Sequence, residues 1–171
     1  MTAYVALLRA VNVSGTGKLP MPELAAMCVA AGHGKVRTYI ASGNVVFTSD
    51  RTEAQVKADL QKRLALYAGK PVGVMVRTAA EMAAVRDANP FPHAPGNRVV
   101  AIFLDDRPPA DTADTAVNKA EYEEIALGVR EIYVRYDEGM GTSKLRIPAA
   151  KSGTARNMNT VAKLAEMSAA L

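Results

Sequence analysis

The chain has 171 residues, of which 49% are hydrophobic and 22% charged, with a net charge of +4, one cysteine and two histidines. Its length suits one sizeable domain or two small ones, and its composition is that of a globular protein. These features exclude a disulfide framework and make a structural zinc site unexpected, because paired Cys/His spacings are absent. No apolar run reaches the roughly 20 residues of a membrane span, and the start lacks a signal-peptide pattern, so we expect a cytoplasmic location.

The first half of the chain predicts a strand, a helix, a two-stranded hairpin, a second helix and a strand. The segments are 4–13, 20–32, 36–42 with 45–49, 52–69 and 71–77. The first is an apolar run typical of a buried strand, and Gly43-Asn44 predicts a two-residue hairpin turn. This order predicts a ferredoxin-like arrangement of two helices on one antiparallel sheet.

The second half predicts a partial repeat of that order. Its segments are a helix at 78–88, a Pro-rich break at 89–97, a strand at 98–106, a short helix within 111–122, a hairpin at 122–136 and a closing helix. We therefore expect an α+β protein with two ferredoxin-like halves, antiparallel sheets and a C-terminal helix. The expected domains are a first half at 1–77, a connection at 78–97 and an incomplete second half at 98–171.

The positive charge is concentrated at the end of the chain. Basic and acidic residues balance over 1–139, whereas 140–171 is strongly basic. The residues concerned are Lys144, Arg146, Lys151, Arg156 and Lys163, against Glu166 alone. Such a block favours an anionic partner, although a solvated face explains most charge runs.

The loop VNVSGTGKL (11–19) resembles a phosphate-binding loop but fails the Walker A pattern at Asn12 and Leu19. Its backbone and Lys18 could still face an anion, or it could be a plain connection between a strand and a helix. Arg9 is expected on the apolar strand face of Val5 and Leu7. Its guanidinium then needs either an acidic partner or an anion at the end of the sheet, beside Asn12.

The stretch KSGTARNMNT (151–160) predicts a helix capped by Thr154, whose first N–H groups favour a phosphate or carboxylate. At 100° per residue the inward side consists of Met158, Val161, Leu164, Ala165 and Ser168. The outward side consists of Arg156, Asn159, Thr160 and Lys163. A solvated outer face explains this pattern as well as a ligand does.

Catalytic chemistry has little support in the sequence. Cys28 lies among small apolar residues and is expected to be a packing residue. We expect His33 and His93 in exposed loops, and neither Ser42 nor Ser143 has a recognisable base. We expect no cofactor and no metal.

Several stretches resemble those of one family, the bacterial domain of unknown function 1697. They are LLRAVNVSGTGKLPMPEL, VRTYIASGNVVF, NPF, GMGTSKL and GTARNMNTVAKLAEM. The resemblance covers essentially the whole chain and implies a cytosolic α+β protein with two ferredoxin-like halves, without an established activity. The polar positions it carries over are Arg9, Asn12, Lys18, Ser42, Gly43, Asn44, Ser143, Lys144, Arg156, Asn157, Asn159 and Thr160. This chain has Met158 where the family usually has tryptophan, and a shorter segment RIPAAK.

Our first hypothesis is a protein that binds a phosphate-bearing ligand, either a small anion such as a nucleotide or a nucleic-acid backbone, in a basic cleft. The expected ligand-binding residues are Arg9, Asn12, Lys18, Ser42, Asn44, Lys144, Thr154, Arg156, Asn157, Asn159 and Lys163. The alternatives are a metal-independent phosphate-handling enzyme and a charge-steered interaction protein without a small ligand. The chain is expected to be a monomer or a homodimer, with no membrane partner.

Overall fold

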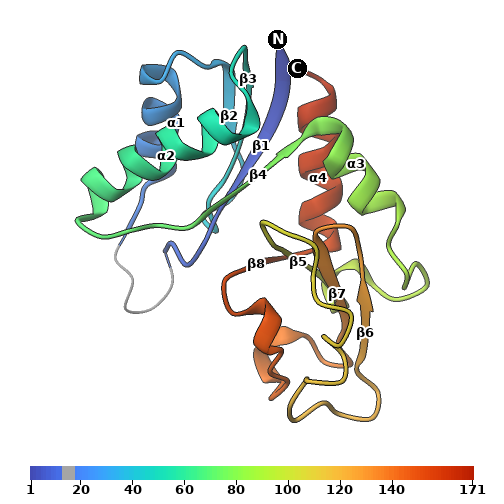
Figure 1. Cartoon of the computed structure of the whole chain (residues 1–171). Coiled ribbons are helices and arrows are strands. Elements are labelled where there is room, and N and C mark those ends of the chain that lie inside the picture. Colours follow the sequence, from blue (N-terminus) through green and yellow to red (C-terminus); the bar gives the residue numbers. More distant parts are fainter. Residues whose placement is uncertain (13–17) are drawn as a thin grey trace. The chain divides into compact units, whose positions relative to one another are not determined.

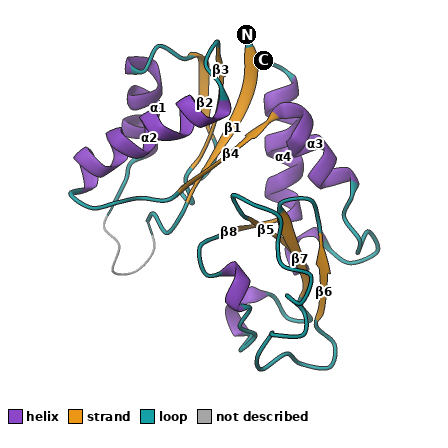
Figure 2. Cartoon of the chain, viewed as in Figure 1, coloured by secondary structure: helices purple, strands orange, loops and turns teal. Residues whose placement is uncertain are grey.

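The computed structural model describes residues 1–12 and 18–171, and by their contacts these divide into two units. The first unit comprises Met1–Ala83 with Leu164–Leu171, and the second comprises Ala84–Lys163. Figure 1 labels the elements and Figure 2 shows helices and strands by colour. The domain ranges expected from the sequence stay a prediction.

The first unit follows the order βαββαβ. Its elements are β1 (Thr2–Leu8), α1 (Met21–Ala30), β2 (Gly34–Thr38), β3 (Asn44–Ser49), α2 (Glu53–Ala68) and β4 (Val74–Thr78), and α3 (Ala79–Asp87) begins in this unit and ends in the second. The strands form an antiparallel sheet in the order β2-β3-β1-β4. Helices α1 and α2 lie on one face of this sheet (Figure 1).

The alternating direction of side chains along β1 explains how the core between the sheet and helices α1 and α2 is formed. Tyr4, Ala6 and Leu8 point into a core that they share with α1 and α2, because successive strand residues face opposite sides. From the helices the core receives Leu24, Cys28, Val56, Leu60 and Leu64. The spacing of four residues along α2 places its apolar side chains on one face.

Helix α2 has the start and end that its sequence predicts. Thr52 and Gln55 form a reciprocal capping box, with Gln55 N donating to Thr52 Oγ1 at 3.2 Å and Thr52 N donating to Gln55 Oε1 at 3.0 Å. At the other end Gly69 adopts a left-handed φ of 71° and stops the helix.

The second unit is a second antiparallel sheet with little helix. Its strands are β5 (Val99–Phe103), β6 (Glu124–Leu127), β7 (Glu131–Arg135) and β8 (Thr154–Asn157), in the order β6-β7-β5-β8. Three short 3-10 turns lie at Gly96–Arg98, Met140–Thr142 and Pro148–Ala150. Helix α4 (Met158–Ala169) follows β8 directly, and its final turns belong with the first unit. The core of this sheet contains Val100, Ile102, Ile132, Val134 and Tyr136.

The α+β class, the two antiparallel sheets and the two halves are confirmed, whereas the ferredoxin-like description of each half stays a prediction. The expected short helix within 111–122 is wrong. That segment consists of turns and one isolated bridge, in which Val117 and Arg146 exchange backbone hydrogen bonds of 2.8 Å. The described residues contain no helix long and apolar enough to cross a membrane.

Candidate functional site

A cavity of about 350 Å³ lies in the first unit, beside the end of β1. Three cationic side chains line it, namely Arg9, Lys18 and Lys70. The rest of its described lining is mainly apolar and consists of Ala10, Val11, Leu19, Leu64, Tyr67, Ala68, Pro71, Val72 and Gly73. Among these described residues there is no carboxylate, so the local field favours an anion. The volume is at the small end of the range for ligand pockets.

The end of β1 is held from both sides by backbone hydrogen bonds. Leu8 N donates to Gly43 O at 2.8 Å, and Arg9 N donates to Gly73 O at 2.9 Å. The chain then turns sharply, because Ala10 and Asn12 both have a φ of 55°. A left-handed conformation is unfavourable for alanine and tolerated by asparagine. The turn carries the chain from the end of β1, an inner strand of the sheet, to the cavity.

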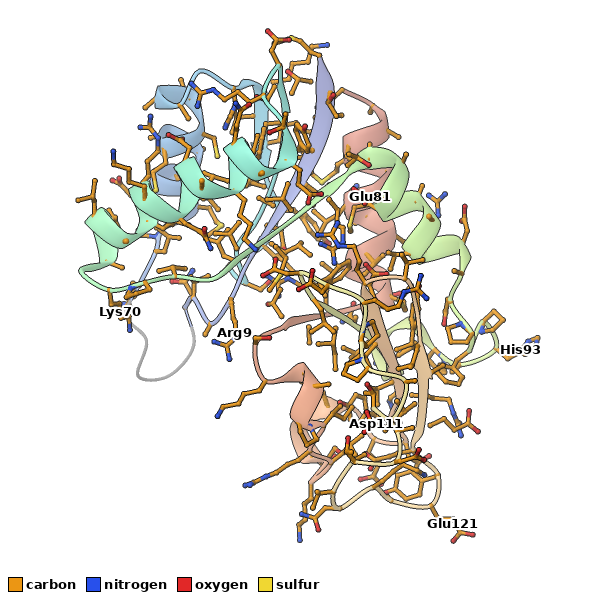
Figure 3. The ribbon with its side chains drawn as sticks, in the orientation of Figure 1. Arg9, Lys70, Glu81, His93, Asp111 and Glu121 are labelled. Carbon is orange, nitrogen blue, oxygen red and sulfur yellow. The ribbon has the colours of Figure 1, made fainter. Side chains whose placement is uncertain are left out.

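Arg9 was expected on an apolar strand face, and this is wrong. β1 ends at Leu8, and Arg9 is exposed at the rim of the cavity. Its aliphatic stem lies against Gly73, where a Cβ would come within 3.1 Å of Arg9 Cβ and 3.3 Å of Arg9 Cδ. Figure 3 shows Arg9 and Lys70 at the same end of the first unit. The absence of a side chain at Gly73 therefore leaves room for the arginine.

Asn12 ties the segments around the cavity together. Its Nδ2 donates to Leu19 O and to Ala41 O, both at 2.8 Å, while its Oδ1 accepts from Leu19 N at 2.7 Å. Both Nδ2 hydrogens are therefore used within the protein. The side chain therefore links Leu19 to Ala41 in the loop of the hairpin. We assign it a positioning role, and it brings Lys18 beside the wall of the cavity.

The SGTG part of the SGTGK loop, residues 14–17, lies outside the described residues, so only Lys18 of this prediction is placed. Lys70 and Tyr67 were missed by the sequence reasoning. Both follow from the way α2 ends, since Gly69 stops the helix and the next residues lead into β4. The sequence signal that could have indicated Lys70 is the run Gly-Lys-Pro-Val-Gly at 69–73. In it a lysine lies between two glycines just before a predicted strand.

The hairpin residues Ser42 and Asn44 do not line this cavity. The predicted hairpin is present, but the loop between the strands is Tyr39–Gly43, and Asn44 is the fully buried first residue of β3. Asn44 Nδ2 donates to Tyr39 O at 2.9 Å and to Ser42 Oγ at 3.0 Å. These contacts close the loop, and the turn is longer than the two residues expected.

The second predicted group lies in the other unit, and its local structure differs from the prediction. Thr154–Asn157 is strand β8, paired antiparallel with β5, and α4 begins only at Met158. The expected N-cap at Thr154 is therefore wrong, because a long-range strand pairing takes these backbone groups. Thr160 N instead donates to Asn157 Oδ1 at 2.9 Å, which makes Asn157 the capping residue.

Arg156 is buried, with 7% of its surface exposed, and does not face outward as expected. Its Nη1 donates to Thr154 Oγ1 at 2.7 Å and to Ala155 O at 2.9 Å. Burial lowers the pKa of this guanidinium to about 10. Thr160 is also buried. The inward side predicted for α4 is confirmed by the burial of Met158, Val161, Leu164, Ala165 and Ser168.

The remaining predicted residues of the second unit are scattered. Asn159 is exposed and packs on Gly96, where an added Cβ would lie 2.1 Å from Asn159 Oδ1. Lys163 is half-buried, and Lys144 is exposed beside Ser143. Ser143 Oγ donates to Glu123 Oε2, and the other oxygen of this buried carboxylate accepts from Ala120 N at 2.8 Å. These bonds fasten the GMGTSKL motif to the start of β6.

His33 is a further correction. It was expected in an exposed loop, but it is 6% exposed and stacks on Phe47 with ring centroids 4.3 Å apart. Burial, and secondarily the charge of Arg51, lowers its pKa. Cys28 is buried in the core as predicted, and burial raises the pKa of its thiol to about 12. No group of three or more His, Cys, Asp or Glu side chains suited to a metal occurs in residues 1–12 and 18–171.

The fold is that of an α+β protein of two antiparallel sheets, and comparison with known proteins agrees. Residues 1–133 match the family described as protein of unknown function (DUF1697), and the chain belongs to that family. A solved structure of similar fold is the conserved bacterial protein SP0830 from Streptococcus pneumoniae, with a TM-score of 0.77 and 23% identity over 98% of both chains. At this identity the likeness shows the fold alone. None of the curated proteins matches the chain.

Proposed function

We propose that this protein binds a small phosphate-bearing anion in the cavity beside the end of β1. The observation that carries the proposal is the charge pattern of the lining: Arg9, Lys18 and Lys70 come from three segments, and no described lining residue is acidic. A phosphate group is matched by several converging cations, with arginine supplying directional N–H donors and lysine a point charge.

Local construction gives further support. The Asn12 side chain forms hydrogen bonds with Leu19 and Ala41, which hold Leu19, the residue next to Lys18, in place. Ala10 lines the cavity in a left-handed conformation, and such backbone strain tends to persist at functional positions. Arg9 and Lys70 are exposed, so the affinity is expected to fall as salt is raised.

The test is calorimetric titration with inorganic phosphate, ribose 5-phosphate and nucleoside monophosphates at low and high salt. Lys18→Ala and Lys70→Ala are each expected to weaken binding by roughly five-fold or more, the size of one charge-assisted contact. Lys62→Ala is the matched control, because Lys62 is exposed on α2 but does not line the cavity. Equal losses in all three variants, or no binding of any probe, would overturn the proposal.

A further inference from the structure

The described lining of the cavity contains both cationic and apolar side chains. We propose, resting on the phosphate-binding function above, that its ligand is a mononucleotide whose base lies against the Tyr67 ring. A bare phosphate would be served by the cations alone. The apolar lining of Leu64, Tyr67 and Val72 calls for a second, poorly solvated part of the same ligand.

Tyr67 is the aromatic residue in the described lining, and 46% of its surface is exposed. It sits in the last turn of α2, three residues before Lys70, so ring and ammonium are presented by one short stretch of chain. Bases of any sequence stack on aromatic side chains, and Tyr does so without a specific hydrogen-bond pattern. Residues 67–70 thus offer an aromatic ring on which a base can stack and an ammonium group that can bind a phosphate.

The size of the cavity selects among ligands with these two parts. At about 350 Å³ it suits a single nucleotide better than a dinucleotide. A nucleic-acid strand would instead need a groove continuing past the cavity, with further aromatics to stack successive bases. We therefore assign the site to a monomeric ligand.

Titration of the full chain with a nucleoside monophosphate and with ribose 5-phosphate tests the assignment. The nucleotide is expected to bind about ten-fold more tightly than the sugar phosphate, because stacking one base on an aromatic ring contributes an affinity gain of about that size. Tyr67→Ala should remove this difference and leave ribose 5-phosphate binding unchanged, whereas Tyr67→Phe should keep it. Leu66→Ala is the control, since Leu66 is 78% exposed on the same turn and does not line the cavity.

The outcomes separate the two proposals. If neither probe binds, phosphate binding itself is wrong. If both bind equally in the wild type, or if Tyr67→Ala weakens both alike, the phosphate site stands and the base platform is refuted. A trinucleotide that binds more tightly than the monophosphate would refute the monomeric ligand. Circular dichroism of Tyr67→Ala checks that the variant is folded, and Tyr67→Leu, which keeps apolar bulk and lacks the aromatic ring, replaces it if it is not.

Discussion

The end of β1 and the β8–α4 junction are both rich in Arg, Asn and Thr or Lys, yet they use these residues differently. At β1 the cations Arg9 and Lys18 are exposed and border a cavity. At the junction Arg156 and Thr154 are buried and bonded to each other, and Asn157 caps a helix. The same residue types thus build a candidate ligand site in one place and internal structure in the other. Burial and hydrogen-bond partners, more than composition, separate the two roles.

The largest expected loss of stability comes from Gly43→Ala, which disturbs the packing of the hairpin loop against the end of β1. A Cβ at Gly43 would lie 2.6 Å from Val11 Cγ2 and 2.9 Å from Leu8 Cβ, at a φ of 91°. Backbone strain and overpacking together should cost about 3 kcal/mol of unfolding free energy, measured by urea denaturation. Gly69→Ala is the control, because it has a φ of 71° with nothing within 4 Å and should cost only about 1 kcal/mol. Equal costs would mean that the hairpin does not pack tightly against the end of β1.

A matched pair of arginine variants tests the comparison directly. Arg156→Ala should lower the unfolding free energy by about 2 kcal/mol, because it leaves a cavity and removes donors from buried oxygens. Arg9→Ala should change it by less than about 0.5 kcal/mol, as expected for an exposed side chain. The same variants should differ in the opposite sense in phosphate binding, with Arg9→Ala the weaker binder.

The control for Arg156 is Arg156→Met, which keeps the aliphatic bulk and removes a desolvated charge. It should be less destabilising than Arg156→Ala, since a buried charge is costly to maintain. If Arg156→Ala instead leaves stability unchanged and abolishes phosphate binding, the assignment of the two regions is reversed. Both quantities come from chemical denaturation and calorimetry of the same preparations.

Local signals predicted the elements that local interactions build. Thr52 and Gly69 mark the ends of α2, and the 3.6-residue period gave the buried side of α4 correctly. The helix start at Thr154 failed because Thr154–Asn157 pairs with β5, a partner some fifty residues earlier in the chain. Strand pairing at that separation leaves no local trace, and a strong capping pattern then suggests a helix one turn too early.

The residues of the candidate site likewise differ in whether local sequence signals could indicate them. Arg9 was selected as a charged residue on an apolar strand and Lys18 as part of the Gly-rich loop that follows it, and both line the cavity. Lys70 was missed because the glycines around it are only a weak signal, and its place near Arg9 depends on β4 lying beside β1 in the sheet. Asn12 was selected as a ligand-binding residue, and its amide donates to the backbone oxygens of Leu19 and Ala41, contacts with distant segments that the sequence alone does not show. Residue type indicates the chemistry available, and the fold decides which of it faces a ligand.

The smallest of the three expected losses of stability concerns His33, a buried polar group that resembles neither region. Its Nε2 finds no hydrogen-bond partner among the described residues, and burial holds the pKa of the imidazole below 6.5 in the folded state. The unfolded chain therefore takes up the proton at higher pH than the folded chain. The contribution to stability is complete above pH 6.5 and declines as the pH falls below that value.

Between pH 7 and pH 5 the wild type should lose about 1 kcal/mol of unfolding free energy relative to His33→Phe, since one proton is worth at most about 1.4 kcal/mol per pH unit. The phenyl ring keeps the stack on Phe47 and cannot be protonated. Arg51, Asp59 and Arg63, which also act on His33, are present in both proteins, so the difference between the two urea-denaturation curves isolates the histidine. Parallel curves would mean that the folded protein protonates His33 as readily as the unfolded chain does. Burial without a partner would then carry no cost here, in contrast to the bonded burial of Arg156.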